Sequence, residues 1–344
     1  MKTKVLIGLA VVLIFTRCKN ENKSDQPSDS SYDFSIALGS CNNVNLPNHL
    51  WDDIRALSPD VFVWGGDIVY ADGGDMTTLE LQYQQQNAQE AYQQLKQHTD
   101  IIGTWDDHDY GLNDGGVEFE DKQESQQLFL DFLGVASDDQ RRTREGVYTS
   151  KTYAVKNQKI KVIILDTRYF RSPLTTDPSG EKRYIPNNYG EGTMLGDAQW
   201  NWLEEELLEQ DIDYNVIISS IQFLSSLHGF ESWGTMPHEV DKLLGLLKSS
   251  HASNVMLVSG DRHISEFSKL NDTELPYPLI DFTTSGLTHS YAAFEGEENP
   301  YRVAEVVADK SFGLLRFDLN SQQVSFSMHT DKIPFKQELL IKYN

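Results

Sequence analysis

Residues 101–111 read IIGTWDDHDYG, an apolar run that leads directly into three carboxylates around one imidazole. The run itself, residues 101–105, predicts a buried strand, and the acidic cluster begins at Asp106. Carboxylates this close repel one another, and burial adds the cost of removing their charges from water. The stretch therefore predicts either a metal site or a solvent-exposed loop at the end of a strand.

Three further apolar runs also end in polar clusters. They are residues 34–40, which end in the GSC of 39–41; residues 60–64, followed by the GGD of 65–67; and residues 255–259, followed by the GDRH of 260–263. In α/β sheets the carboxyl ends of the strands carry the loops that bind ligands. We therefore expect the four clusters to meet at one edge.

Helical patterns alternate with these strands and predict an α/β fold. The predicted helices are residues 48–57, 79–98, 197–208 and 238–247. The other predicted strands are residues 159–165, 215–220 and 280–284, with more between 303 and 328, where a hairpin turns at 320–321. We expect a sheet-centred sandwich that forms a single catalytic domain, residues 33–344.

Taken singly, the smaller clusters allow ordinary readings. Asp67 follows two glycines, and Gly-Asp is a common turn dipeptide. Asp261 and His263 are two residues apart, so on an extended segment both side chains point the same way, which suits a shared metal as well as a surface pair. For these smaller clusters, it is the ordered series of motifs that favours a metal centre.

The N-terminal residues have the pattern of an export signal. A short basic start precedes an apolar run of residues 5–15, which is too short to span a membrane, and Cys18 follows. We expect residues 1–18 to be a signal peptide of the lipoprotein type with Cys18 lipidated, and residues 19–32 to be a flexible tether; ordinary secretion is the alternative. Cys41 would then be the lone thiol of the mature domain, either buried as a small hydrophobe or acting as a ligand.

The amino-acid composition limits which kinds of ligand the protein can bind. The 344-residue chain has a net charge of −23, which excludes nucleic-acid binding through bulk positive charge. An acidic surface suits hard cations such as Ca²⁺, which prefer oxygen ligands. A hydrophobic content of 39% is sufficient for a large folded core.

In their order, the motifs resemble those of the PhoD-like alkaline phosphatases and phosphodiesterases, within the calcineurin-like metallophosphoesterase superfamily. The matching motifs are GSCN (39–42), GDIVY (66–70), WDDHDYG (105–111), LDTR (165–168) and SGDRH (259–263). The resemblance covers roughly residues 34–328 and implies a four-layer α/β/β/α sandwich with two or more metals at one edge.

The resemblance also implies a set of ligands. Asp67 would bridge the metals; Cys41, Tyr70 and His263 would hold Fe³⁺, and Asp107 and Asp261 would hold Ca²⁺, although other divalent metals could also bind. The donor chemistry agrees, since thiolate and phenolate suit Fe³⁺ and carboxylates suit Ca²⁺. Gln222 stands where relatives in the wider superfamily have a metal-binding histidine, which leaves that ligand open.

A mechanism follows from the implied metals: a metal-activated water attacks phosphorus. His108 is expected to donate a proton or a hydrogen bond, oriented by Asp109, with a purely structural role as the alternative. Arg168, as a catalytic and substrate-binding residue, and Arg262 are expected to bind the phosphate, and a structural ion pair is the alternative for each.

The expected function is an exported, metal-dependent hydrolase of small phosphate esters, acting as a phosphomonoesterase or phosphodiesterase. A nuclease or phospholipid diesterase with the same metal site is one alternative, and a non-catalytic surface lipoprotein that binds calcium or a glycan is another. We expect a monomer, anchored by lipid to a membrane on its periplasmic or cell-surface side, or otherwise periplasmic or secreted.

Overall fold

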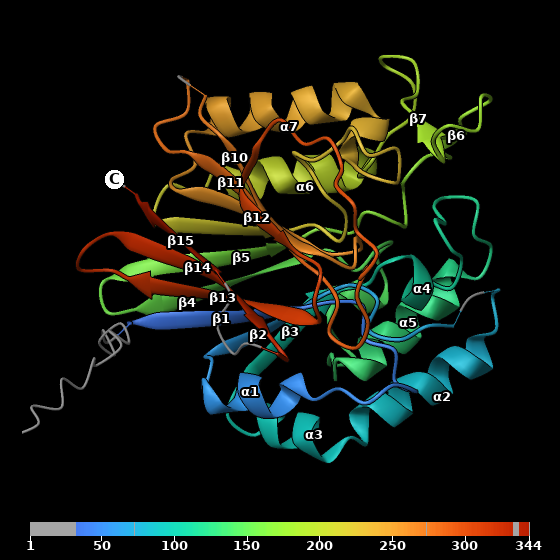
Figure 1. The fold of residues 1–344 in the computed structure, drawn as a ribbon, viewed down its shortest axis with the longest axis horizontal. Coiled ribbons are helices and arrows are strands. Elements are labelled where there is room, and N and C mark those ends of the chain that lie inside the picture. Colours follow the sequence, from blue (N-terminus) through green and yellow to red (C-terminus); the bar gives the residue numbers. More distant parts are fainter. Residues whose placement is uncertain (1–31, 72, 273, 333–336, 344) are drawn as a thin grey trace, which may run out of the picture. The chain divides into compact units, whose positions relative to one another are not determined.

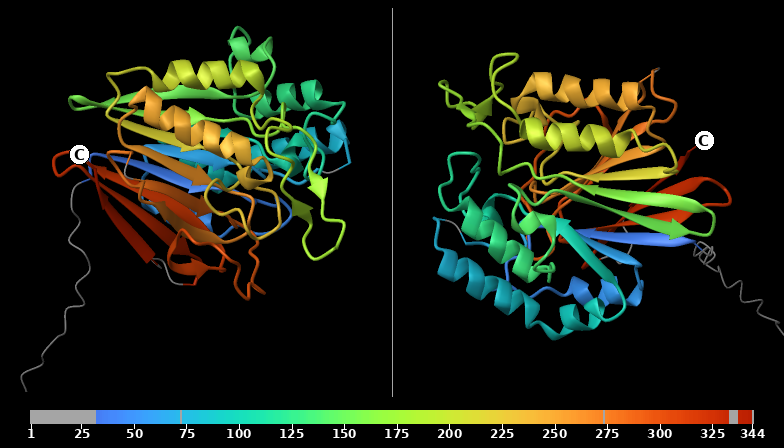
Figure 2. Two further views of the ribbon diagram at one scale, coloured as in Figure 1. Left: turned by 90° about the horizontal axis from the view of Figure 1, so that it is seen from above. Right: turned by 180° about the vertical axis from the view of Figure 1, so that it is seen from behind.

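Two sheets lie face to face, and helices cover the outer side of each (Figure 1; Figure 2). The computed structural model describes residues 32–71, 73–272, 274–332 and 337–343. The predicted signal peptide, its lipidated Cys18 and nearly all of the tether lie outside these residues. The layers are helix, sheet, sheet and helix, which confirms the four-layer sandwich.

The first sheet has six strands in the order β15-β14-β13-β1-β2-β3. They are β1 (Phe34–Gly39), β2 (Val61–Gly65), β3 (Asp100–Thr104), β13 (Ser311–Asp318), β14 (Gln323–Thr330) and β15 (Gln337–Lys342). The first three strands are parallel, and β13 and β14 form the predicted hairpin. The C-terminal strand β15 pairs with β14, so this segment extends the sheet.

The second sheet has seven strands in the order β12-β10-β11-β9-β8-β5-β4. They are β4 (Thr149–Val155), β5 (Gln158–Ile164), β8 (Tyr214–Ile218), β9 (Val255–Ser259), β10 (Ser265–Leu270), β11 (Leu279–Thr284) and β12 (Arg302–Val307). Its centre, β5-β8-β9-β11, is parallel. A separate small hairpin, β6 (Thr175–Thr176) and β7 (Tyr184–Ile185), projects beside this sheet (Figure 1).

Helices on both outer sides complete the layers. Those beside the first sheet are α1 (Leu50–Ala56), α2 (Met76–Asn87), α3 (Glu90–Lys96), α4 (Asp107–Tyr110) and α5 (Lys122–Phe132), and those beside the second are α6 (Gly196–Leu207) and α7 (Pro237–Ser250) (Figure 1). Two 3₁₀ turns, Gln140–Arg142 and Trp233–Thr235, lie in loops. None of the helices in the described ranges combines the length and apolar character needed to cross a bilayer.

The single helix predicted for residues 79–98 is wrong, because α2 and α3 are separate helices. Gln89 lies between them in an extended conformation with φ −65° and ψ 122°. Its side chain accepts a hydrogen bond of 3.2 Å from the indole N–H of Trp51 in α1. The Gln-rich stretch has a high helix propensity, but the packing of α3 against α1 interrupts the helix at Gln89.

Strand β2 shows why the apolar runs are continuous. Val61 and Val63 belong to the core between the sheets and under α6 and α7, whereas Phe62 and Trp64 belong to the core under α1 and α3. Alternate side chains of a strand point to opposite faces, and here both faces are buried.

The predicted edge is formed by both sheets together. The loop after β9 touches the loops after β1 and β2 so closely that a Cβ on Gly260 would lie 2.6 Å from the carbonyl oxygen of Gly65 and 2.8 Å from Ser40 Oγ. Only glycine allows backbone to approach backbone at this distance. The clusters that follow β1, β2, β3 and β9 therefore meet where the two sheets meet.

Candidate metal centre

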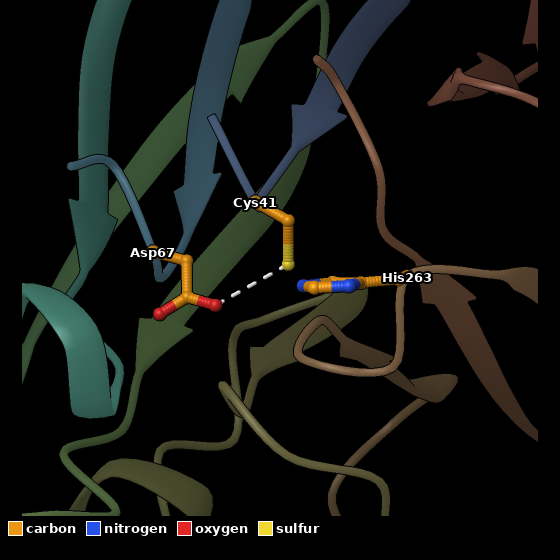
Figure 3. A group of neighbouring side chains, drawn as sticks. All are labelled: Cys41, Asp67 and His263. Atoms are coloured by element: carbon orange, nitrogen blue, oxygen red, sulfur yellow. Dashed lines mark hydrogen bonds between the residues drawn. The ribbon is translucent and has the colours of Figure 1, made fainter. Parts of the chain in front are cut away.

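Cys41 follows β1 and carries a fully buried thiol. Its Sγ lies 3.3 Å from Asp67 Oδ2 and 3.0 Å from Ser285 Oγ. Figure 3 shows the thiol between the carboxylate of Asp67 and the ring of His263. Burial raises the pKa of Cys41 to about 12, so without a nearby cation the thiol stays protonated.

Asp67 lies in the turn after β2. Gly66, with φ 99°, lets this turn pack on the next loop, since a Cβ there would be 2.5 Å from Asp106 Cβ. The Asp67 carboxylate accepts hydrogen bonds from the Tyr70 hydroxyl at 3.3 Å and the His108 backbone N–H at 3.4 Å. Burial, together with nearby Cys41 and Asp107, raises the pKa of Asp67.

Tyr70 and His263 complete the first group of donors. The Tyr70 hydroxyl lies 3.2 Å from His263 Nε2, and the His263 backbone N–H donates to Ser285 Oγ at 2.8 Å. Burial raises the pKa of Tyr70 and lowers that of His263. One donor atom each from Cys41, Asp67 and His263 lies within 4.8 Å of the others. The residues predicted to hold Fe³⁺ therefore lie together.

Carboxylates form the second group. Oxygens of Asp106, Asp107 and Asp261 lie within 4.8 Å of one another, and Asp67 joins Asp107 and His108 in a similar group. Burial raises the pKa of Asp261 to about 6. Burial acts on Asp107 in the same direction, but Arg168 and His108 outweigh it and lower the pKa of this carboxyl. The two predicted Ca²⁺ ligands therefore lie together, beside Asp67.

Asp106 is a candidate ligand that the sequence analysis did not assign. Its Oδ1 accepts from Arg168 Nε at 2.6 Å and from Ser220 Oγ at 2.7 Å. Its Oδ2 is buried and has no hydrogen-bond partner among the described residues. An unpaired buried carboxylate oxygen is costly, and a cation would remove that cost. The donor set and this orphaned oxygen both fit bound metal; the adjacent acids of the WDDHD stretch were the available signal.

Four of the donor residues have a left-handed backbone conformation. The φ angles are 55° at Cys41, 52° at Asp67, 63° at Asp261 and 53° at His263. Non-glycine residues adopt this region rarely, and each instance costs about 1–3 kcal/mol. Such strain persists only where surrounding contacts impose it, so it marks these turns as a candidate functional site.

Asp109 is one of those contacts. Its fully buried carboxylate accepts hydrogen bonds from the backbone N–H groups of Asp67 at 3.1 Å, Ile68 at 3.1 Å and Asp106 at 2.7 Å. Burial raises the pKa of Asp109 to about 7. Asp109 thus fastens the turn after β2 to α4, and it acts on the centre through the backbone.

The geometry of Arg168 favours its structural alternative over phosphate binding. Its side chain has no exposed surface, and it pairs with Asp106 and, at 2.7 Å, with both carboxylate oxygens of Glu231. A buried guanidinium is stable only when its charge is paired in this way. Arg168 can therefore reach Asp106 but does not line the cavity above the centre.

Gln222 has a place apart from the donors. Its Nε2 donates at 2.7 Å to Glu266 Oε1 and to Thr283 Oγ1, so the side chain belongs to a buried polar network on β10 and β11. Its Oε1 is buried and has no hydrogen-bond partner among the described residues. The amide nitrogen of Gln222 therefore has a structural role, and no ligand role is assigned to the side chain.

A cavity of about 420 Å³ opens above the donors. Besides Asp67, Asp107, Asp261 and the two histidines, its lining includes Asn113, Asp114, Arg183, Phe230, Arg262 and Tyr291. His108 borders it with its ring 4.2 Å from that of Tyr70. Arg262 is bonded to Glu297 at 2.6 Å and lies over the Phe230 ring. Arg183, Phe230 and Tyr291 come from loops that carried no motif.

Comparison with known proteins identifies the family. A family model described as PhoD-like phosphatase matches residues 36–326. The chain belongs to this family. The resemblance drawn from the motifs is thereby confirmed, and membership supports a metal-dependent hydrolase of phosphate esters.

Individual relatives of this PhoD-like chain are distant. Alkaline phosphatase D of Bacillus subtilis (strain 168) is 30% identical over 121 residues, which is 31% of this chain and 20% of that protein. The match thus spans about one fifth of the curated relative.

Solved structures agree on the fold. A structure of PhoD superposes with a TM-score of 0.70 at 15% identity, over 90% of this chain and 68% of that one. A dimetal phosphatase from Danio rerio matches with a TM-score of 0.53 at 12% identity, covering 91% and 100% of the two chains. GAP50, the anchor in the inner membrane complex of Plasmodium, superposes with a TM-score of 0.58 at 13% identity, over 91% of this chain and 90% of that one. At these identities the likeness shows the fold alone.

The buried carboxylates predict a stability that depends on metal. We expect a chelator to lower the unfolding temperature, because the cluster around Asp67 then holds uncompensated charge; a cation at 100 times its dissociation constant stabilises by about 2.7 kcal/mol. Asp67→Asn removes one buried charge, so in chelator the variant should unfold at or above the wild-type temperature, and in excess metal below it. Scanning calorimetry under both conditions measures this crossing.

The exposed Asp52→Asn variant is the control and should follow the wild type under both conditions. An Asp67→Asn variant that is destabilised equally with and without metal would show that Asp67 serves the fold alone.

Proposed function

We propose that this PhoD-like protein is a metal-dependent hydrolase of small phosphate esters, a phosphomonoesterase or phosphodiesterase. The observation that carries the proposal is that Asp67, Asp107, Asp261 and His263 line one cavity, and that the buried thiol of Cys41 lies beside Asp67 and His263. A volume of about 420 Å³ is in the range of sites for small molecules.

Each part of the site has a role in this reaction. When bound, the cations supply an activated water nucleophile and neutralise charge on the phosphoryl oxygens. His108 borders the cavity and donates a proton or a hydrogen bond to the leaving oxygen. Asp109 holds the turns that carry Asp67 and Asp106, and Arg168 holds the Asp106 carboxylate by a hydrogen bond.

We infer a division of metals from the donor types. Cys41, Tyr70 and His263 would hold Fe³⁺, because thiolate and phenolate are strong anionic donors for it. Asp107 and Asp261, joined by Asp106, would hold Ca²⁺, which prefers carboxylate oxygens. Asp67 touches both groups and would bridge them.

The proposal favours small substrates over long nucleic acids. A net charge of −23 repels long polyanions, and the cavity over the donors, at about 420 Å³, is of a size for a small molecule. A nuclease or phospholipid diesterase would use the same donors, and a calcium- or glycan-binding lipoprotein would use them without turnover. Rates on matched substrates separate these functions.

Activity is the direct test. The purified, metal-loaded protein should hydrolyse nitrophenyl phosphate or bis(nitrophenyl) phosphate, and Asp67→Asn should lower kcat/KM at least about 100-fold with the fold retained, because the bridging donor is lost. The Asp52→Asn variant should keep full activity. Absence of hydrolysis of every ester tested, with metal bound, would favour the binding protein.

Iron can be tested by its colour. Elemental analysis should find iron and calcium in the purified protein, and Cys41→Ser should lose or shift the visible absorption band that thiolate and phenolate ligation give. Tyr70→Phe should shift the same band, whereas Tyr92→Phe, which removes a buried hydroxyl bonded to Trp64, should leave it unchanged. If the purified protein is colourless and retains other bound metals, the assignment of Fe³⁺ to this group of donors is wrong.

We also propose that the protein is exported and lipid-anchored through Cys18, a residue outside those the structure describes. The support is the apolar run of residues 5–15 followed by this cysteine. In a bacterial host, the wild-type full chain should partition with membranes and into detergent, and Cys18→Ser should not. Equal partitioning of both chains into the soluble exported fraction would leave ordinary secretion.

A further inference from the structure

One wall of the cavity is built from two segments that lie far apart in the chain. The β6–β7 hairpin packs on residues 227–230: the Tyr184 N–H donates to the Gly229 carbonyl oxygen at 2.9 Å, and Lys182 Nζ donates to that of Leu227 at 2.8 Å. Gly229 has a φ of 83°, and a Cβ at this position would lie 2.7 Å from the aliphatic carbons of Lys182, so only glycine fits here. The hairpin and this segment therefore form one unit.

This wall carries Arg183 into the cavity. The Arg183 side chain is 49% exposed, whereas that of Arg262, which also lines the cavity, is 7% exposed and is paired with Glu297. The side chains of Arg168 and Arg171 are fully buried in pairs with Glu231. Of the arginines described around the centre, Arg183 has the most exposed side chain.

The present partner of Arg183 has a second hydrogen-bond donor of its own. Arg183 pairs with Asp114, and Asp114 Oδ2 also accepts a hydrogen bond of 2.6 Å from the Tyr184 hydroxyl. If Arg183 turned to another anion, the Asp114 carboxylate would keep this donor and would not be left unpaired. The Asp114 side chain is only 13% exposed, so the incoming phosphoryl charge has to compensate for the ion pair that is lost.

Asp114 also ties this arginine to the metal centre. Its backbone N–H donates to Asp107 Oδ2 at 2.7 Å. The residue that holds Arg183 is thus bonded to a candidate metal ligand, and both Arg183 and Asp107 line the same cavity. An anion bound over the carboxylate cluster would come within the range of the guanidinium.

We propose that Arg183 binds the phosphoryl group of the substrate, exchanging Asp114 for two non-bridging phosphoryl oxygens. The planar guanidinium presents paired N–H donors that match two oxygens of a phosphate. A dianionic monoester gains more from this contact than a monoanionic diester, so the residue favours monoesters. The inference rests on the proposed hydrolase function and names a substrate contact within it.

The test compares Arg183→Gln with Arg55→Gln in the metal-loaded protein. Arg55 makes a matched control, because it too is a half-exposed arginine paired with an aspartate, and it does not line the cavity. Arg183→Gln should raise KM for nitrophenyl phosphate and the inhibition constant of inorganic phosphate about 10-fold or more. KM for bis(nitrophenyl) phosphate should rise less, and Arg183→Lys should recover part of the loss.

Calorimetric binding of inorganic phosphate distinguishes this inference from the proposed function. Even if no ester is hydrolysed, wild type and Arg55→Gln should bind phosphate alike, and Arg183→Gln should bind it about 10-fold more weakly. Equal phosphate affinity in all three proteins, no phosphate binding by the wild type, or equal losses for monoester and diester would overturn the assignment.

Discussion

The arrangement of the site depends on one constraint: three buried aspartates and a partly buried fourth must share a small volume where the two sheets meet. Asp67, Asp106, Asp107 and Asp261 repel one another, and burial removes the water that would screen them. Arg168 compensates only part of this charge, through Asp106. Such a cluster is stable when the acids are protonated or when cations bind, and the second state is the one that suits phosphate-ester chemistry.

The backbone is built to hold the cluster despite its cost. Four donor residues have left-handed conformations, and the contacts around them are specific. Asp109 accepts from three backbone N–H groups of two neighbouring turns, and Ser285 bonds both Cys41 and the backbone of His263. Gly260 lets the second sheet approach the first. These contacts orient the donors before any metal arrives, which lowers the ordering cost of binding.

The arginines divide the work around the cavity according to burial. Arg168 is enclosed and positions Asp106, Arg262 is tied to Glu297 over Phe230, and Arg183 keeps an open surface on the hairpin wall. A guanidinium that must bind and release an anion needs solvent access and a partner that tolerates its departure. Arg183 has both, which is why a phosphate contact is assigned to it and not to Arg168 of the LDTR motif.

The sequence alone predicts the main strands of the fold and most of the residues at the candidate metal centre. The apolar runs before GSC, GGD, WDDHD and GDRH predicted strands that end at one site, because continuous apolar strands need cover on both faces and leave their polar ends to the ligand. Local pattern could not predict the split of the 79–98 helix, where a contact between Trp51 and Gln89 overrides propensity. The local pattern also could not predict that Arg168 is buried in ion pairs while Arg183 is exposed to the cavity. Nor could it predict that one carboxylate oxygen of Asp106 has no hydrogen-bond partner among the described residues. Which side chains are buried, paired or open to solvent depends on segments far apart in the chain, and only the packing of the two sheets brings those segments together.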